Sequence, residues 1–464
     1  QEVLSRTACE IGRNEITARF EVGFPAFGRT INSGELIRIF FDFLPGCVEN
    51  VFFYRRQNNA EIKKRITLAD DQQFIRNELK RLDLVSFVAD GSILPRETGV
   101  SDRPMKGSVA FHSPDSLRIT LNLPGHGPIS GMAIHRGITL IVGGGYHGKS
   151  TLLKALESGV YNHIPGDGRE YVITDETAVK LRAEDGRSIN HVDISLFIRD
   201  LPNKKDTTCF STADASGSTS QAAAVIESIE AGTRAFLIDE DTSATNFMLR
   251  DDLMQRIVSR DKEPITPFIE RARDLYKQAG ISTVLVAGSS GAYFFIADTI
   301  IQMDAYRPFD ITEMVKNACE QEASKPAIQA PGFKLPTAGR KLAAGGTGRA
   351  VGAMALNFGD SRAEAGGESQ EEGENSGRSG RFGNRGGSAS DAERFERGRG
   401  GRRETDRNSD RNTRIKVRVH DKHSFQVAKE PVDLRFVEQL ADSEQTAALA
   451  QMVRYCLEKG LLER

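Results

Sequence analysis

The sequence predicts an α/β protein centred on a sheet of parallel strands, and three observations carry this prediction. An apolar run over 138–142 leads straight into a glycine-rich loop and then into a helical pattern. A second apolar run, 235–239, ends in acidic residues, and a third covers 283–287. Apolar runs of this length are typical of strands that a parallel sheet buries on both faces.

The loop after the first strand has the spacing of a phosphate-binding loop. Counted from Gly143, it fits G-x-x-x-x-G-K-[ST] at every fixed position. Its glycines let backbone N–H groups approach phosphate oxygens, and the next helix points its positive end at the same anion. We therefore expect ATP here, with Lys149 reaching the β- and γ-phosphates and Ser150 holding Mg²⁺. The residues assigned to the nucleotide are Gly143, Gly144, Gly145, Tyr146, His147, Gly148, Lys149, Ser150 and Thr151.

Acidic residues at the end of the second strand complete this chemistry. Asp239 closes the run 235–239, and Glu240 follows it directly. A buried strand that ends in acids behind a phosphate loop is typical of the second motif of such nucleotide-binding proteins. We expect Asp239 to lie behind Mg²⁺ and Glu240 to polarise the attacking water as a general base. Lys149 and Glu240 are thus the predicted catalytic residues.

A polar segment dense in Ser, Thr and Gly, residues 206–221, leads into the helical run 222–231. Such a helix start presents hydroxyl and amide groups that suit a second phosphate group. The same residues are equally compatible with an ordinary N-capped loop. On the residues alone, both interpretations stay open.

Composition sets limits on partners and location. The chain has 464 residues, and its 62 Lys and Arg nearly cancel its 64 Asp and Glu, so the overall charge selects no partner. Its five cysteines are scattered without a CxxC pair, which indicates neither a zinc site nor a disulfide framework. No apolar run approaches a membrane span, so we expect a soluble intracellular protein. The chain begins at Gln1, and we expect the native N-terminus, with any targeting peptide, to lie upstream.

The composition along the chain predicts four parts. Residues 1–135 form an N-terminal α+β domain, cut at its start, and residues 136–336 form the nucleotide-binding domain. Residues 337–413, rich in Gly, Arg, Ser and Glu, form a disordered insertion. Residues 414–464 are a small C-terminal α/β segment of one strand and helices.

Local patterns predict the elements within these parts. Strands are expected at 16–22, 51–54, 85–88, 117–123, 414–419 and, as the last strand of the central sheet, 299–303. Helices are expected at 33–44, at 70–82 with Asp70 as the N-cap, at 432–440 and at 446–457.

Local clusters of cations favour RNA as a partner. Arg414, Lys416 and Arg418 lie on one face of the strand predicted at 414–419. Glycine-arginine tracts at 382–387 and 397–403 resemble segments that bind single-stranded nucleic acid by charge and stacking. The insertion also carries many acids, so a plain linker fits its composition as well, and the strand cations alone fit a solvated face.

These motifs together resemble the predicted ABC-class ATPases, and they cover most of residues 85–315. The matching stretches are 143–151, 161–168, 180–187, 215–221, 238–247 and 262–267. The glycine-arginine insertion is similar to that of the kinetoplastid mitochondrial RNA-editing member of this family. The resemblance implies an ABC-type P-loop core, a homodimer that encloses two ATP molecules, and a mitochondrial location if the RNA-editing likeness holds. Each phosphate loop would face the signature segment, residues 216–221, of the other subunit.

Two departures from the family pattern matter, one for the γ-phosphate contact and one for the rate of turnover. The signature reads Ser-Gly-Ser-Thr-Ser-Gln in place of the usual L-S-G-G-Q, so Ser216, Gly217 and Ser218 are all candidates for the γ-phosphate contact. The switch histidine expected after the strand 283–287 is replaced by Gly288-Ser289-Ser290, which predicts slow hydrolysis. Asp193 is the candidate for the glutamine-loop residue. The leading prediction is a slow ATPase that acts on RNA; alternatives are an ATP-dependent RNA-binding clamp with negligible turnover and a small-molecule kinase.

Overall fold

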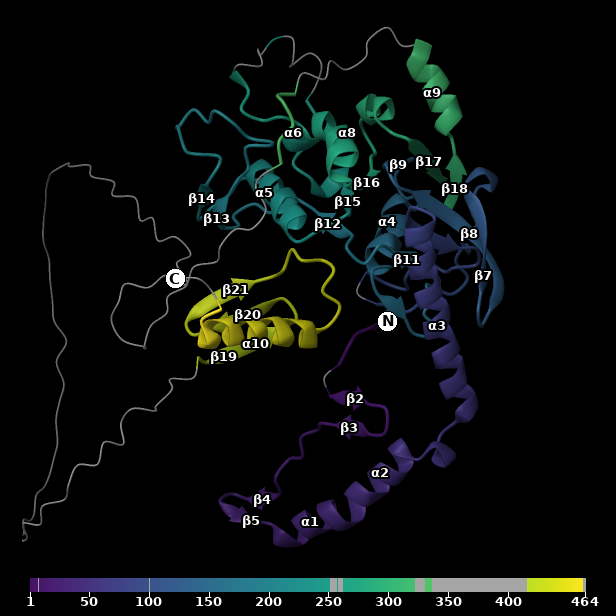
Figure 1. The fold of residues 1–464 in the computed structure, drawn as a ribbon, viewed down its shortest axis with the longest axis vertical. Coiled ribbons are helices and arrows are strands. Elements are labelled where there is room, and N and C mark those ends of the chain that lie inside the picture. The colour runs from purple at the N-terminus through teal and green to yellow at the C-terminus, as the bar shows by residue number, and fades with distance from the viewer. Residues whose placement is uncertain are drawn as a thin grey trace, which may run out of the picture.

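The computed structural model describes residues 1–6, 8–99, 101–250, 257, 262–321, 330–335 and 415–461 (Figure 1). The expected insertion, its two glycine-arginine tracts and Arg414 lie outside the described residues.

A six-stranded sheet forms the centre of the molecule, in the order β12-β15-β16-β9-β17-β18. Its strands are β9 (Ile138–Val142), β12 (Val179–Leu181), β15 (Ala235–Asp239), β16 (Ser282–Val286), β17 (Thr299–Asp304) and β18 (Arg307–Asp310). All neighbours are parallel except β17 and β18. The predicted parallel sheet is confirmed, but the prediction that 299–303 is its last strand is wrong. The edge is β18, which the chain reaches through a tight turn.

Helices and a second sheet cover the two faces of the central sheet. On one face lie α4 (Lys149–Ser158) and an antiparallel sheet in the order β11-β6-β8-β7. Its strands are β6 (Leu84–Ala89), β7 (Arg118–Leu123), β8 (Gly127–His135) and β11 (Val172–Thr174). On the other face lie α5 (Gly217–Glu230), α6 (Thr245–Met248), α8 (Phe268–Ala279) and α9 (Thr312–Gln321). Two short hairpin or bridge pairs, β13 (Ile189–Val192) with β14 (Phe210–Thr212) and β1 (Glu2–Val3) with β10 (Asn162–His163), complete the body.

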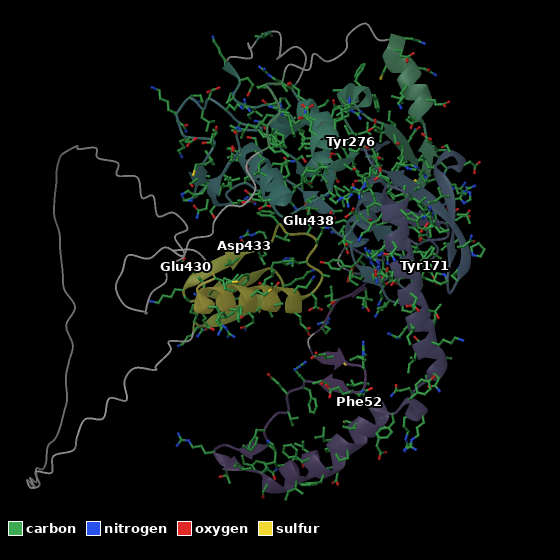
Figure 2. The ribbon with its side chains drawn as sticks, in the orientation of Figure 1. Phe52, Tyr171, Tyr276, Glu430, Asp433 and Glu438 are labelled. Atoms are coloured by element: carbon green, nitrogen blue, oxygen red, sulfur yellow. The ribbon has the colours of Figure 1, made fainter. Side chains whose placement is uncertain are left out.

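Residues 8–57 form an N-terminal arm that extends away from this body (Figure 1). Its elements are β2 (Cys9–Ile11), β3 (Ile16–Ala18), β4 (Ala26–Phe27), β5 (Thr30–Ile31), α1 (Ser33–Arg38) and α2 (Leu44–Phe52), with one π-helical segment (Ile39–Phe43) joining the two helices. Two predictions fail here. The strand at 16–22 ends at Ala18, and the strand at 51–54 is the end of α2 followed by a short 3-10 helix. Figure 2 shows Phe52 near the end of α2.

The arm joins the body through α3 (Asn59–Arg81), which starts eleven residues before the predicted Asp70. Asn58 is the N-cap, and its side chain accepts a hydrogen bond from the Glu61 N–H at 3.3 Å. The buried residues of α3 begin only at Leu68. The first turns of α3 therefore connect to the arm, and the later turns pack on β6.

The C-terminal residues 415–461 form a three-stranded sheet backed by a helix. The elements are β19 (Val417–Asp421), β20 (Ser424–Val427), β21 (Glu430–Asp433) and α10 (Ser443–Lys459). The helix predicted at 432–440 is wrong, because Val432 pairs with Phe425 in the sheet and turns follow β21. The helix predicted at 446–457 lies within α10.

The loop before α10 docks this C-terminal segment on the body. Gln439 Nε2 donates to the Ala178 carbonyl at 3.0 Å and to the Glu157 carbonyl at 3.4 Å, and Gln439 Oε1 accepts the Lys180 N–H at 3.1 Å. The Tyr161 hydroxyl donates to the Gln439 carbonyl at 2.7 Å. Glu438, labelled in Figure 2, pairs with Arg182 at 2.8 Å. The contacts reach the end of α4 and strand β12.

In the part of the chain that the structure describes, no helix combines the length and apolar character needed to cross a membrane.

Candidate functional site

The glycine loop between β9 and α4 has the shape of an anion cradle. Gly148 is the N-cap of α4 and has φ 95°, a left-handed conformation that favours glycine. Lys149 opens the helix and folds back over the loop, and its Nζ donates to the carbonyls of Gly143 at 2.7 Å and Gly144 at 2.8 Å. The loop therefore places glycine backbone and one ammonium group beside a helix N-terminus, an arrangement that suits an anion.

The two predicted acids lie beside this loop, because β15 ends at the same edge of the sheet as β9. The Ser150 hydroxyl lies 3.4 Å from Asp239 Oδ2. A hydroxyl and a carboxylate in contact form the kind of oxygen pair that Mg²⁺ prefers, so these side chains fit a metal held mainly by phosphates. The structure thus brings Lys149, Ser150 and Asp239 together, although they are up to 90 residues apart in sequence.

Glu240 is held by the loop after β16. Its Oε2 accepts the N–H of Gly288 at 2.8 Å and that of Ser289 at 3.1 Å, and its Oε1 accepts the Ser289 hydroxyl at 2.5 Å. This loop is the place where the switch histidine was expected. Tyr293, further along, is fully buried, and burial together with the negative charge of Glu240 raises the pKa of its hydroxyl above the usual range.

The hairpin of β17 and β18 packs its tip on the glycine loop. Ala305 and Tyr306, at φ 46° and 66°, form a tight turn in the left-handed region. The His147 carbonyl accepts the Tyr306 N–H at 3.1 Å, and the His147 ring accepts the Ala305 N–H at 3.0 Å. A side chain at Gly148 would place its Cβ 2.7 Å from the Tyr306 ring, so this position requires glycine.

The signature segment forms the start of helix α5. Ser216 is the N-cap, and its hydroxyl accepts the Thr219 N–H at 3.4 Å. Gln221 is buried, donates to the Ser243 hydroxyl at 3.0 Å and accepts the Ala244 N–H at 2.9 Å. The segment is thereby tied to the residues that follow Glu240. Among the described residues, no hydrogen bond joins Ser216, Gly217 or Ser218 to the glycine loop of the same chain.

The remaining predicted residues lie away from this site. Lys416, just before β19, and Arg418, within it, are exposed. Val417 between them packs with residues of α10, so the two cations lie on the opposite face of the sheet. Arg414 lies outside the described residues. Asp193 accepts the N–H of Ser195 at 3.0 Å and makes no contact with the glycine loop among the described residues.

Sequence reasoning missed the contacts of Ser289, Tyr306 and Gln221. Ser289 was noticed only as a replacement for histidine, and its bond to a carboxylate 49 residues away has no local signal. The turn at Tyr306 lacks the glycine or asparagine that normally marks a two-residue hairpin. Gln221 ends the signature segment, but the contacts of its buried amide with Ser243 and Ala244 depend on the fold.

Three family models match the chain. The P-loop domain of the ABC_ATPase family matches residues 58–335, the N-terminal domain of ABC-class ATPases matches 1–55, and the MRB1590 C-terminal domain matches 416–464. Among curated proteins, the uncharacterized protein MJ1628 of Methanocaldococcus jannaschii is 31% identical over 229 residues, which cover 47% of this chain and 50% of that protein. The chain thus spans about half the length of this relative.

Solved structures of ABC-type ATPase domains are also similar, at low scores. cbiO1 from Clostridium perfringens, part of the ABC transporter complex cbiONQ, matches 51% of this chain and 92% of its own, with 14% identity and a TM-score of 0.32. The ADP conformation of MJ1267, an ATP-binding cassette of an ABC transporter, matches 42% of this chain and 88% of its own, with 13% identity and a TM-score of 0.28. Scores at this level support no argument about function.

The family assignment therefore rests on the sequence match and on the site. The matched P-loop domain covers more than half of the chain and contains the glycine loop, both acids and the signature segment. The chain belongs to the family of ABC-class P-loop ATPases.

Proposed function

We propose that this protein hydrolyses Mg-ATP at the interface of a homodimer and acts on RNA. The observation that carries the proposal is the grouping of Lys149, Ser150, Asp239 and Glu240 at one edge of the parallel sheet. An ammonium group, a hydroxyl and two carboxylates around a glycine loop form the set that phosphoryl transfer to water requires.

Each residue has one task in this chemistry. The glycine loop N–H groups and Lys149 bind the β- and γ-phosphates and neutralise the charge that develops in the transition state. Ser150 and Asp239 would hold Mg²⁺, which supplies Lewis-acid polarisation of the phosphate oxygens when bound. Glu240 orients the attacking water and takes its proton.

The signature segment supports a dimer. Ser216 is exposed at the N-terminus of α5, a 14-residue helix, while Gly217 and Ser218 behind it are buried. None of the three makes a hydrogen bond to the glycine loop of its own chain among the described residues. A second copy, related by a two-fold axis, would bring each signature segment to the other copy's loop. Such a site is complete only in the assembly.

The C-terminal segment supports RNA as the partner. Lys416 and Arg418 are exposed on an open sheet face, in the same residues that match the MRB1590 C-terminal domain. Cations on a flat face bind phosphates without selecting bases, so we expect strong salt dependence and little sequence preference. The family resemblance extends this proposal to mitochondrial RNA editing.

Phosphate release by the purified chain tests the proposal. Wild type should release phosphate slowly from Mg-ATP, and Glu240→Gln should bind ATP while losing at least about a hundredfold in turnover, because the amide cannot accept the proton. Equal rates for the two proteins would remove Glu240 from the mechanism. If neither protein turns over but both bind ATP and RNA, the protein is an ATP-dependent clamp. Phosphate transfer that needs an added acceptor would indicate a kinase.

A further inference from the structure

The Glu240 carboxylate is bound on both oxygens, and the two oxygens are bound differently. Oε2 accepts two backbone N–H groups, those of Gly288 and Ser289, at 2.8 and 3.1 Å. Oε1 accepts a single donor, the Ser289 hydroxyl, at 2.5 Å. A carboxylate oxygen has about two acceptor positions. Oε2 is therefore saturated, and Oε1 keeps one lone pair for another donor.

The loop that holds the carboxylate is itself fixed. The Ser290 hydroxyl accepts the Ala292 N–H at 3.3 Å and caps the 3-10 helix Gly291–Phe295. Tyr293 in this helix is 1% exposed and belongs to the main core cluster. On the other side, a Cβ at Gly288 would lie 4.0 Å from Lys149 Cε. The loop is thus anchored in the core after Ser289, and Gly288 before it lies beside Lys149.

We propose that Ser289 is a positioning residue that aims the free lone pair of Glu240 Oε1 at the attacking water. The two backbone donors hold Oε2 whatever side chain residue 289 carries. They leave the carboxylate free to tilt about that oxygen, and the Ser289 hydroxyl removes this freedom. A serine thereby fixes the general base at the place where the family resemblance led us to expect a histidine. This inference rests on the proposed function, because aiming Glu240 matters only if Glu240 acts as the base.

The reaction that this geometry serves balances without further reactants. The water oxygen forms a bond to the γ-phosphorus, and the bond from that phosphorus to the β–γ bridging oxygen breaks. The water proton passes to Oε1 of Glu240, and ADP and phosphate leave. Misdirection of the base lowers the rate of this step, and we expect ATP binding to stay unchanged, since among the described residues the hydrogen bond of the Ser289 hydroxyl goes to the carboxylate.

Steady-state phosphate release by the full chain, measured across ATP concentrations, tests the inference. In Ser289→Ala, kcat should fall on the order of tenfold with KM unchanged, because only the chemical step loses alignment. Ser289→Thr keeps a hydroxyl and should stay within about threefold of wild type. Ser108→Ala is the control: it removes a hydroxyl that donates to the Met105 carbonyl of its own loop, outside the site, and should keep the wild-type kcat.

A second pair of variants separates loss of the hydrogen bond from an effect of the substitution on folding. Ser289→Val and Ser289→Thr have nearly the same shape, and only threonine can donate to Oε1. A lower kcat in valine than in threonine, at equal ATP affinity, supports positioning. If Ser289→Ala and Ser289→Val keep or raise kcat while Glu240→Gln is inactive, the inference is overturned and the proposed function stands. If Glu240→Gln stays active, the proposed function itself fails.

Discussion

The P-loop domain and the N-terminal arm differ in the burial of their phenylalanines. In the domain, Phe87, Phe197, Phe236, Phe247 and Phe268 are all buried, and three of them pack ring against ring. In the arm, eight of the chain's 25 phenylalanines lie within residues 8–57, and none is buried. The arm's phenylalanines are Phe20, Phe24, Phe27, Phe40, Phe41, Phe43, Phe52 and Phe53.

The difference leaves the arm without a buried aromatic core of its own among the described residues. At roughly half exposure, eight phenylalanines present on the order of 800 Å² of apolar surface. A monomer rarely exposes a patch above about 600 Å², whereas one side of a standard protein interface buries about 800 Å². The arm, residues 8–57, also carries six Arg and six Asp or Glu, a balance that gives it no net charge to attract RNA. A second copy of the chain, the partner that the proposed function already requires, is the expected cover.

The largest expected difference between the two regions is in how much a phenylalanine-to-alanine substitution lowers the free energy of unfolding. Phe236→Ala, in the core, should lower the free energy of unfolding by about 3–5 kcal/mol. Phe41→Ala, 74% exposed in the arm, should change it by less than about 0.5 kcal/mol in the monomer. Urea unfolding at high dilution measures both. Equal losses would mean that the arm shares the core.

Nucleotide binding should separate the two regions next. Lys149→Ala should weaken binding of a fluorescent ATP analogue about a hundredfold, because a charged group that faces phosphates is lost. Lys154→Ala, one turn further along α4 and paired with Glu157, is the control and should bind normally. Wild-type affinity in Lys149→Ala would contradict the phosphate-loop assignment.

Assembly is the third test, and it acts on the arm alone. Phe40→Asp combined with Phe41→Asp should raise the dimer dissociation constant at least about tenfold without nucleotide, since charges would enter an apolar interface. Phe309→Asp changes a phenylalanine of the body that is about as exposed as Phe40, and it should leave the dimer intact. Light scattering gives the mass. A wild-type chain that is monomeric without nucleotide would show that the arm has another partner.

The smallest expected effect is on RNA binding, and it comes from substitutions in the C-terminal segment that alter neither the P-loop domain nor the arm. Replacing Lys416 and Arg418 with alanine should reduce the slope of log affinity against log salt by about 1.4, at about 0.7 for each phosphate contact to a single strand. Lys429 and Lys459, exposed elsewhere in the same segment, form the control pair. An unchanged slope would leave the residues outside the described structure as the RNA contact.

The sequence predicted the parts of the site that depend on local order. The glycine loop, Lys149, Ser150 and the acids after β15 follow from one strand, one helix start and one strand end. The contact between Ser289 and Glu240 did not follow, because it depends on β15 and β16 lying side by side in register. For the arm, apolar spacing predicted a helix near 33–44, but spacing cannot tell a buried apolar face from an uncovered one. The division of the chain at residues 135 and 336 stays a prediction.

Two wrong elements show where local signals compete. Residues 51–54 are apolar and aromatic, as strands are, yet helix α2 continues into them from Leu44. Residues 432–440 have helical spacing, yet Val432 lies in a hairpin whose pairing with β20 starts at Glu430. In both cases the neighbouring element decides the outcome, and a short window does not contain it.

The docking loop at Gln439 couples the C-terminal segment to movements of helix α4. The side-chain amide of Gln439 forms hydrogen bonds with Glu157 in the last turn of α4, with Ala178 just before β12 and with Lys180 in β12. A shift of α4 along its axis must therefore break these bonds or carry residues 415–461 with it. Because α4 begins at Lys149, a movement that starts at the phosphates is passed through α4 and the Gln439 hydrogen bonds to the basic face of β19.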